Sequence, residues 1–391
     1  MRLCVVSHKD CWQDDAGVWR SQGGFPFQMG AIGSLFDSMT IVIVRGEARL
    51  GGIPLPRHAT VVGLREPTGA DWRRKLSVVA HLPYYLRAIG HHIRKADVVH
   101  VAPPGDIPFL GLLAAIALRK RLVARYCGSW TVTSQTTLMN RVTRQCMRQF
   151  AGGRNLMLAT GAGAGAPARG MNWIMATAVS EREVATVQPD LRRAPNEPMR
   201  LAYVGRLTSV KGVGNIISAL GSLRRDPLLV GRVPRLTIVG DGSLRPELAA
   251  LAKREGCEEN VRFTGHLDRA EVLEHLLQSD VCVLPSLSES FCKARLDALL
   301  CGVPVITTAV GFGREIVGAD GERGWLVVPG DVGALAVTLR SVLTRPIDWR
   351  ALRERCRAYV KERTLEAWAR EIGEQCARQW HVGFGNGRLV S

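Results

Sequence analysis

The stretch MRLAYVGRLTSVKG, residues 199–212, decides how this sequence is expected to fold. Residues 199–205 form a short, mainly apolar run that ends at Gly205, which is typical of a strand buried within a parallel sheet. A helical pattern over 211–225 follows after a short loop. The stretch therefore predicts the strand–loop–helix unit from which α/β domains are built.

The same alternation continues through the second half of the chain. Further strands are predicted at 235–242, 261–265, 280–286, 303–309 and 324–329, with helices at 244–255, 268–278, 290–300 and 331–343. The tail over 349–380 has an amphipathic helical pattern. Together these segments predict a Rossmann-like domain.

The first half has a similar pattern. Strands are predicted at 2–7, 39–44, 97–102 and 120–126, and helical patterns at 74–95 and 107–118. Residues 151–170 are rich in Gly and Ala and read as a loop around a short strand, and 188–198, with three Pro, reads as an interdomain linker. The expected fold class is therefore α/β, with two doubly wound parallel-sheet domains.

Composition agrees with two globular domains and shows an uneven charge. The chain has 391 residues, 46% hydrophobic and 22% charged. Its net charge is +17, and residues 1–195 hold 25 Lys and Arg against 12 Asp and Glu. Such a basic half can face nucleic acid, an anionic membrane or an anionic substrate, unless it only reflects an Arg-rich proteome.

Cysteine usage and apolar runs bear on the compartment. The ten Cys form no C-x-x-C pair and no zinc-type cluster, and several lie in apolar runs, so we expect buried free thiols in a reducing compartment. Leu3–Val6 is too short for a signal peptide, and Ile107–Leu118 is too short for a membrane span. We therefore expect a cytoplasmic protein.

Two clusters of residues predict an anion and sugar site. Arg206 and Lys211 follow a strand and lie beside a helix start, where two cations and free backbone amides could bind a diphosphate. Glu289 and Asp297 are eight positions apart, and a helix starting at Ser288 or Glu289 would place them about 12 Å apart. Two such carboxylates could hold hydroxyl-bearing groups, and amides at the helix start could face an anion. The alternative for each cluster is that its charged residues lie on the surface, face water and bind no ligand.

Six ordered motifs make the second half resemble the family 4 (group 1) glycosyltransferases of the GT-B fold. They are YVGRLTSVKG (203–212), LTIVGDGSLRPEL (236–248), VRFTGHLDRAEV (261–272), DVCVLPSLSESF (280–291), DALLCGVPVIT (297–307) and GREIVGADGERGWLVVPGD (313–331). The resemblance implies two Rossmann-like domains facing across a cleft. The expected parts are an acceptor-binding domain at 1–187, a linker at 188–198, a nucleotide-sugar-binding domain at 199–364, and a helix and tail at 365–391 that return to the first domain.

The resemblance also implies roles for the motif residues. Arg206, Lys211 and Glu289 match the catalytic set, in which the cations hold the donor diphosphate and the Glu contacts sugar hydroxyls. Asp297 stands where the family has a second Glu that contacts the ribose, and it is one methylene shorter. The other donor-side positions implied are Gly23, Gly24, Gly205, Gly265, His266, Ser290, Phe291, Cys292 and Lys293.

In the first half, the matches are fewer. Gly23-Gly24 stand at the family's first glycine loop, and the alternative is a plain turn before a helix. His100 matches a frequent family His, although a lone His at a strand end is more often structural, and Asp106 could contact an acceptor hydroxyl. Cys127 stands where many relatives have a His, which leaves the first domain's part in catalysis open.

The expected enzyme is a retaining, metal-independent hexosyltransferase without a cofactor. Its donor would be a nucleotide diphosphate sugar, and its acceptor a glycan or lipid-linked precursor. No Asp-x-Asp occurs in the sequence, so protein cations would stabilise the leaving diphosphate. Segment 72–95 mixes basic, aliphatic and aromatic residues and is broken by Pro83, which predicts either peripheral binding to the inner face of the membrane or an ordinary solvated helix.

Three other functions stay open at this stage. The chain could be a GT-B sugar-nucleotide epimerase or phosphorylase, which the spacing of Arg206, Lys211 and Glu289 disfavours. It could be a catalytically silent GT-B subunit that binds a partner enzyme, a possibility kept by Asp297 and Cys127. Nucleic-acid binding is disfavoured, because no recognition motif accompanies the basic charge.

Overall fold

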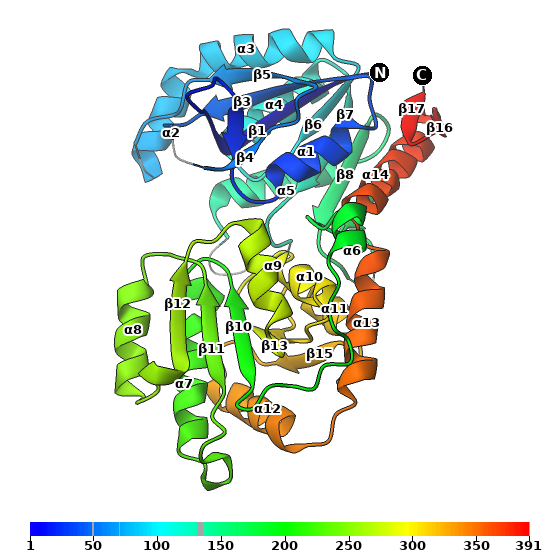
Figure 1. The fold of residues 1–391 in the computed structure, drawn as a ribbon. Coiled ribbons are helices and arrows are strands. Elements are labelled where there is room, and N and C mark those ends of the chain that lie inside the picture. Colours follow the sequence, from blue (N-terminus) through cyan, green and yellow to red (C-terminus); the bar gives the residue numbers. More distant parts are fainter. Residues whose placement is uncertain (49–50, 70, 131–135, 164, 391) are drawn as a thin grey trace. The chain divides into compact units, whose positions relative to one another are not determined.

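The computed structural model describes residues 1–48, 51–69, 71–130, 136–163 and 165–390. The chain divides into two compact units, one of Met1–Ala178 with Leu365–Ser391 and the other of Val179–Thr364. Each unit has its own mainly parallel sheet covered by helices (Figure 1). These are the two α/β domains that the strand and helix patterns predict.

The first unit is built on a nine-stranded sheet. Its strands are β1 (Arg2–Gln13), β2 (Trp19–Ser21), β3 (Ser38–Arg45), β4 (Ile53–Pro54), β5 (Ala59–Leu64), β6 (Val98–Val101), β7 (Arg121–Tyr126), β8 (Asn155–Thr160) and β9 (Met171–Ile174). Seven of them run parallel in the order β5-β3-β1-β6-β7-β8-β9, and β2 and β4 add an antiparallel edge. The strand order reverses between β1 and β6, which is the topological switch point of this sheet.

Helices cover both faces of that sheet, because successive strand residues point to opposite sides. In β1, Leu3 and Val5 belong to one buried core, and Cys4 and Val6 belong to the other. The helices of the unit are α1 (Phe25–Gly33), α2 (Asp71–Ala80), α3 (Leu82–Lys95), α4 (Asp106–Ala117), α5 (Leu138–Gln149) and α14 (Leu365–Trp380), followed by the hairpin β16 (Gly383–Gly385) and β17 (Arg388–Val390).

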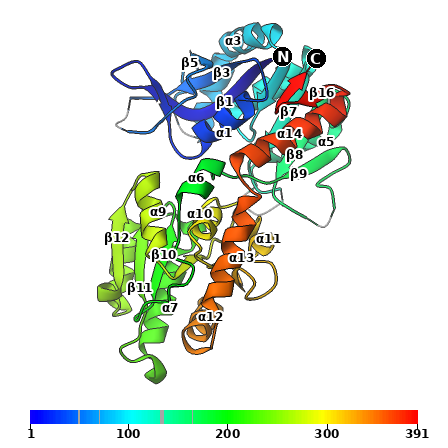
Figure 2. The ribbon, with the colours of Figure 1, turned by 45° about the vertical axis from the view of Figure 1, so that its right-hand side comes forward.

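Helix α14 completes the first core although it comes from the end of the chain. Figure 2 shows it lying along the same unit as α1 and β8. Its Trp368 is fully buried, and the Arg125 guanidinium lies 5.2 Å from the Trp368 ring centroid. Gln379 donates a 2.8 Å hydrogen bond to the Asn155 carbonyl, and Asn172 donates one of 3.0 Å to Gln375. The C-terminal helix is therefore part of the first unit's core.

The second unit has a six-stranded, wholly parallel sheet in the order β12-β11-β10-β13-β14-β15. Its strands are β10 (Arg200–Val204), β11 (Arg235–Val239), β12 (Val261–Gly265), β13 (Val281–Leu284), β14 (Val305–Thr308) and β15 (Gly324–Val327). Its helices are α6 (Glu181–Thr186), η1 (Ser209–Lys211), α7 (Val213–Arg224), η2 (Pro227–Leu229), α8 (Arg245–Arg254), η3 (Glu258–Asn260), α9 (Arg269–Leu277), α10 (Ala294–Leu300), α11 (Gly313–Val317), α12 (Val332–Thr344) and α13 (Trp349–Lys361). The switch point lies between β10 and β13.

The strands predicted from apolar runs are confirmed in both units, and so is the break that Pro83 imposes, because α2 ends at Ala80 and α3 begins at Leu82. The predicted start of the helix near Glu289 is wrong. That helix, α10, begins at Ala294, and the preceding residues form a loop. The hydrogen bonds that hold this loop are described below.

The linker predicted at 188–198 packs on the second unit. Asn196 donates backbone and side-chain hydrogen bonds to the buried carboxylate of Asp280, and Arg193 forms a 3.1 Å ion pair with the same group. Arg357 donates to the carbonyls of Val184 and Val187. Because these bonds attach α6 and the residues after it to the second unit, the division falls after Ala178 and differs from the predicted boundary at 187.

Two further features concern the cysteines and the helices. All ten cysteines are free. Among the described residues, no helix is both long and apolar enough to span a bilayer.

The buried ring of Trp368 gives a test of the C-terminal helix. We predict that Trp368→Ala lowers the free energy of unfolding by about 3–5 kcal/mol, because it removes a large core side chain and leaves a cavity. Urea denaturation followed by circular dichroism measures the change. Trp72→Ala is the control: Trp72 is 64% exposed, and the expected change is below about 0.5 kcal/mol. Equal effects of the two substitutions would contradict the packing role of α14.

Candidate functional site

The carboxyl ends of β10 and β13 are adjacent at the switch point of the second sheet, and a glycine lets their loops touch. Gly212 has φ +67°, and a Cβ atom at this position would lie 2.3 Å from the Pro285 carbonyl oxygen. The Leu287 amide also donates a 2.8 Å hydrogen bond to the Val210 carbonyl. This close approach brings η1, which follows β10, against the loop that follows β13.

Lys211 and Glu289 form an ion pair at this point of contact. Their side chains are 17% and 13% exposed, so the pair is largely shielded from water yet still accessible. Arg206 lies exposed at the end of β10, and its carbonyl accepts a 2.9 Å hydrogen bond from the Tyr203 hydroxyl. No ion pair of Arg206 is found among the described residues. The three residues predicted as the catalytic set thus lie in the segments that follow the two strands at the switch point, β10 and β13.

A buried arginine fixes the loop that carries Glu289. Arg295, on α10, is fully buried and donates 3.2 Å hydrogen bonds to the carbonyls of Phe291 and Val310 and a 2.9 Å bond to the Thr307 hydroxyl. On the other side of the loop, Gly311 has φ +58°, and a Cβ there would lie 2.4 Å from the Ser290 carbonyl oxygen. The loop conformation therefore depends on one buried guanidinium and one glycine.

Because α10 begins after the loop, Glu289 and Asp297 are not related by helical spacing, and the predicted separation of about 12 Å along one helix does not apply. Asp297 is 7% exposed and forms a 3.1 Å ion pair with Arg269, which in turn pairs with Glu183 at 2.5 Å. Burial raises the pKa of Asp297, and the charge of Arg269 opposes the rise. The predicted ribose contact would therefore involve a carboxylate that already has a cationic partner.

The remaining donor-side residues of the second unit lie around the same edge. Gly265 ends β12 with φ +79°, and its carbonyl accepts a 2.9 Å hydrogen bond from the Gly240 amide. His266 follows it and is exposed. Ser290, Phe291, Cys292 and Lys293 form the loop before α10. Cys292 has φ +61°, which turns the backbone sharply just before α10 begins.

The first unit places one of its predicted residues, Asp106, at the switch point between β1 and β6. Asp106 is the first residue of α4, and its carboxylate lies 3.7 Å from Arg74 on α2. Gly105 has φ +144°, and a Cβ there would lie 2.5 Å from Nδ1 of His8. His8 was not predicted as a site residue: it follows the strand predicted at 2–7 and belongs to no motif, and only the structure includes it in β1. Burial lowers the pKa of His8. At the start of α1, Gly23 has φ +68° and Gly24 is the N-cap.

His100 lies inside the sheet and is 1% exposed. Its Nδ1 is 3.2 Å from the Val123 carbonyl oxygen on the neighbouring strand, and its Nε2 has no hydrogen-bond partner among the described residues. Burial, together with the charge of Arg125, lowers the pKa of His100 to about 3. The geometry is that of a neutral structural imidazole, and a contact with a ligand stays a prediction. Cys127, after β7, is partly buried.

Comparison with known proteins shows which sequences and folds this chain resembles. Residues 188–363 match the family described as "Glycosyl transferases group 1". We refer to this segment as the group 1 domain; it spans nearly all of the second unit. A glycogen synthase of Mycobacterium tuberculosis is 38% identical to the chain over 156 residues, which is 40% of this chain and 36% of that protein. The chain thus matches about a third of the length of this relative.

Solved structures extend the similarity to the whole fold. The Anabaena protein HepE, solved in complex with UDP, superimposes with a TM-score of 0.68 at 19% identity, covering 96% of this chain and 99% of its own. A sucrose-phosphate synthase of Thermosynechococcus elongatus gives a TM-score of 0.71 at 18% identity, covering 97% and 99%. The predicted GT-B fold is therefore confirmed, with the group 1 domain as its C-terminal half.

Three residues of the group 1 domain and its surroundings were missed by the sequence analysis: Glu183, Arg269 and Arg295. Their contacts join segments far apart in the chain, since Arg269 bonds residues 86 and 28 positions away. A buried Arg inside an otherwise apolar helix, as in ARLDALL, is the one local signal that could have indicated Arg295.

The buried imidazole of His100 predicts a pH-dependent stability. Because its folded pKa is about 3 and the unperturbed value is 6.5, the unfolded chain takes up a proton first as the pH falls. The stabilisation that the neutral His100 gives to the folded state is thus fully present above about pH 6.5. It is lost as the pH falls toward 3, at up to about 1.4 kcal/mol of unfolding free energy per pH unit. Between about pH 7.5 and pH 5, the wild type should lose about 2 kcal/mol more than His100→Asn, which keeps a donor to Val123. Denaturant titrations at the two pH values measure this, and equal losses would exclude it.

Proposed function

We propose that the chain is a retaining, metal-independent glycosyltransferase that transfers a hexose from a nucleotide diphosphate sugar. The ion pair of Lys211 and Glu289 beside Arg206, at the switch point of the group 1 domain, carries this proposal. Ligands of open α/β sheets bind where the strand order reverses. The proposed site offers cations for a diphosphate and a carboxylate for a sugar hydroxyl at that place.

The two cations supply the electrostatic part of the reaction. When the bond between the sugar and the diphosphate breaks, negative charge grows on the diphosphate oxygens. Arg206 is exposed and available, and Lys211 is held in place by Glu289 and by the contact of Gly212 with Pro285. Fixed cations of this kind stabilise the transition state more than the ground state, because the charge they meet is largest there.

Glu289 positions the sugar. On donor binding, a sugar hydroxyl would donate a hydrogen bond to the Glu289 carboxylate. The Lys211 ammonium would then interact with both Glu289 and the donor diphosphate. The backbone amides of the loop before α10 would face the same group. No side chain here is proposed as a nucleophile; a donor phosphate oxygen would take the acceptor's proton on the front face.

The acceptor side is proposed to lie on the first unit, with peripheral binding to an anionic membrane. On α2, Trp72, Leu76 and Val79 follow helical spacing and are 64%, 58% and 65% exposed. Arg73 and Lys75 flank them and are also exposed. An apolar stripe flanked by cations suits the interface of an anionic bilayer, where a lipid-linked acceptor would be met.

Substitution of the cations tests the reaction. We predict that Lys211→Ala or Arg206→Ala lowers kcat for donor hydrolysis or transfer by about 100-fold or more, because a fixed charge is lost from the transition state. Lys253→Ala, an exposed lysine on α8, serves as the control and should keep wild-type turnover. UDP-, GDP- and ADP-sugars should be compared by thermal shift first, beginning with UDP, the nucleotide bound to HepE.

Two outcomes would contradict the proposal. Wild-type turnover in both Ala variants would remove the diphosphate role of Arg206 and Lys211. A purified chain that binds a nucleotide sugar yet neither hydrolyses nor transfers it would favour a silent subunit, and epimerised donor would favour an epimerase.

The α2 stripe gives a separate prediction about the membrane. Trp72→Ala/Leu76→Ala should lower binding to vesicles containing phosphatidylglycerol by about tenfold or more, since two inserted apolar side chains are lost. Co-sedimentation at low salt measures binding. Leu228→Ala/Val230→Ala removes two exposed apolar side chains from the second unit and should have no effect. If wild-type protein fails to sediment with these vesicles, the membrane proposal falls.

A further inference from the structure

The first unit contains a long stretch without acidic residues. From Ile107 to Ser180 the sequence has nine Lys and Arg and no Asp or Glu. The stretch includes the end of the parallel sheet formed by β7, β8 and β9 and the helix α5. The positive charge of this stretch is therefore not neutralised by acidic residues within the stretch, and it attracts anions.

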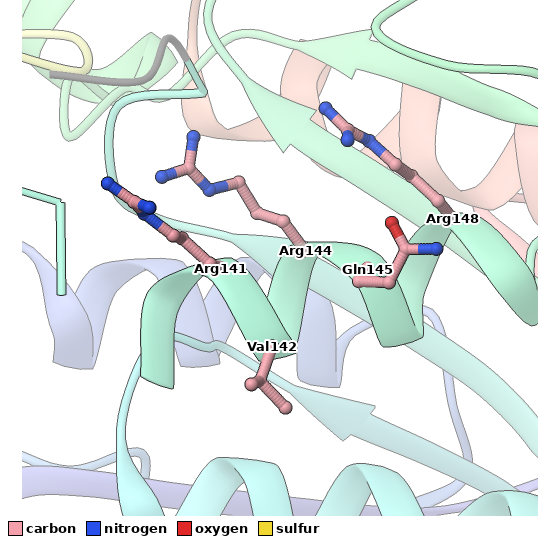
Figure 3. Close-up of a pocket in the computed structure, with 5 residues that line it drawn as sticks. All are labelled: Arg141, Val142, Arg144, Gln145 and Arg148. Carbon is pink, nitrogen blue, oxygen red and sulfur yellow. The ribbon is translucent and has the colours of Figure 1, made fainter. Parts of the chain in front are cut away.

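Within this stretch, three arginines of α5 lie on one helix face. Arg141, Arg144 and Arg148 are spaced by three and four positions, and Figure 3 shows them projecting to the same side of the helix. They line a cavity of about 340 Å³ together with Val142 and Gln145. No carboxylate lines it, and none of the three arginines has an ion-pair partner among the residues that the structure describes.

Two aromatic rings hold two of these guanidinium groups. Arg144 is 3% exposed, donates a 2.7 Å hydrogen bond to the Trp130 carbonyl, and lies 5.7 Å from the Tyr126 ring centroid. The Arg148 guanidinium lies 5.4 Å from the Trp130 ring, and the two rings contact each other edge to face at 5.3 Å. Arg144 and Arg148 are therefore ordered before any ligand binds, which lowers the entropy lost on binding.

The charges explain what the cavity can bind. Neighbouring guanidinium groups repel one another, and burial of Arg144 strengthens this repulsion because the local dielectric constant is low. A phosphate group would offset the repulsion, and the exposed Arg141 and Arg148 can offer it their planar forks, whereas the buried Arg144 already donates to the carbonyls of Asn140 and Trp130 and contributes its charge. The cavity also lies at the ligand-binding edge of the sheet, since Tyr126 is the last residue of β7 and Trp130 is in the loop that follows it.

We propose that the arginine face of α5 binds a phosphate or diphosphate group carried by the acceptor. The assignment to an acceptor rests on the proposed glycosyltransferase function, whereas the anion site itself rests on the α5 residues. The acceptor would thus belong to the phosphorylated class, and its phosphate would fix its position on the first unit.

Binding of inorganic pyrophosphate to the full chain tests this site. Calorimetric titration is done with a saturating concentration of whichever of UDP, GDP and ADP stabilises the chain in the thermal-shift comparison, so that the donor site is occupied. Arg141→Gln/Arg148→Gln should lower the pyrophosphate affinity at least tenfold while leaving the buried Arg144 in place. The matched control is Arg154→Gln/Arg169→Gln, which removes two exposed arginines of the same acid-free stretch that do not line the cavity. The control should stay within twofold of the wild type.

The outcomes separate this inference from the proposed function. If the wild type binds none of UDP, GDP and ADP, the glycosyltransferase proposal fails, and the pyrophosphate titration is repeated without nucleotide to test the α5 site by itself. If pyrophosphate binds equally to both double variants, or does not bind the wild type, the α5 site is overturned. Circular dichroism melting of the variants excludes loss of fold as the cause of weaker binding.

A vesicle arm identifies the source of the phosphate. Phosphatidylglycerol vesicles are added to the pyrophosphate complex of the wild type and of the α2 variant Trp72→Ala/Leu76→Ala. Displacement of pyrophosphate from the wild type supports the α5 site with a membrane-borne phosphate. Retention of pyrophosphate excludes the phosphate of this lipid as the occupant of the α5 site.

Discussion

The site in the second unit depends on one close contact, that of Gly212 with the carbonyl oxygen of Pro285. Only a residue without a Cβ atom lets η1 approach the end of β13 to this distance. The contact brings Lys211 to Glu289, although the two residues are 78 positions apart. Without this contact, Lys211 after β10 and Glu289 after β13 would lie on loops that do not touch.

Buried charge surrounds this contact and fixes the loops that form it. Arg295 holds the loop before α10 through backbone carbonyls, and Arg269 lies between Glu183 and Asp297. Each guanidinium has several acceptors, which offsets the cost of removing it from water. The loop before α10 is therefore held by the buried guanidinium of Arg295, which has no role in the proposed mechanism.

The two units differ in how they use their charge. In the second unit, the partly buried Arg269 is paired with the carboxylates of Glu183 and Asp297. In the first unit, α5 presents three arginines with no acidic residue in the same stretch of chain. Unpaired positive charge favours binding of anions over packing, so the proposed roles of the units, donor chemistry in one and recognition of an anionic acceptor in the other, follow from this difference.

The sequence by itself determined the order of strands and helices, the two Rossmann-like sheets and the residues that follow β10 and β13, because apolar runs and loop residues are local patterns. It placed the start of α10 too early, since the hydrogen bonds of Arg295 and the packing of Gly311 are not visible in a local pattern. Only the tertiary structure showed that Arg269 joins Glu183 to Asp297, that His100 is buried, and that Tyr126 and Trp130 orient the arginines of α5. These features depend on which strands are neighbours and on how side chains from distant segments pack together, and neither is written in the spacing of residues along the chain.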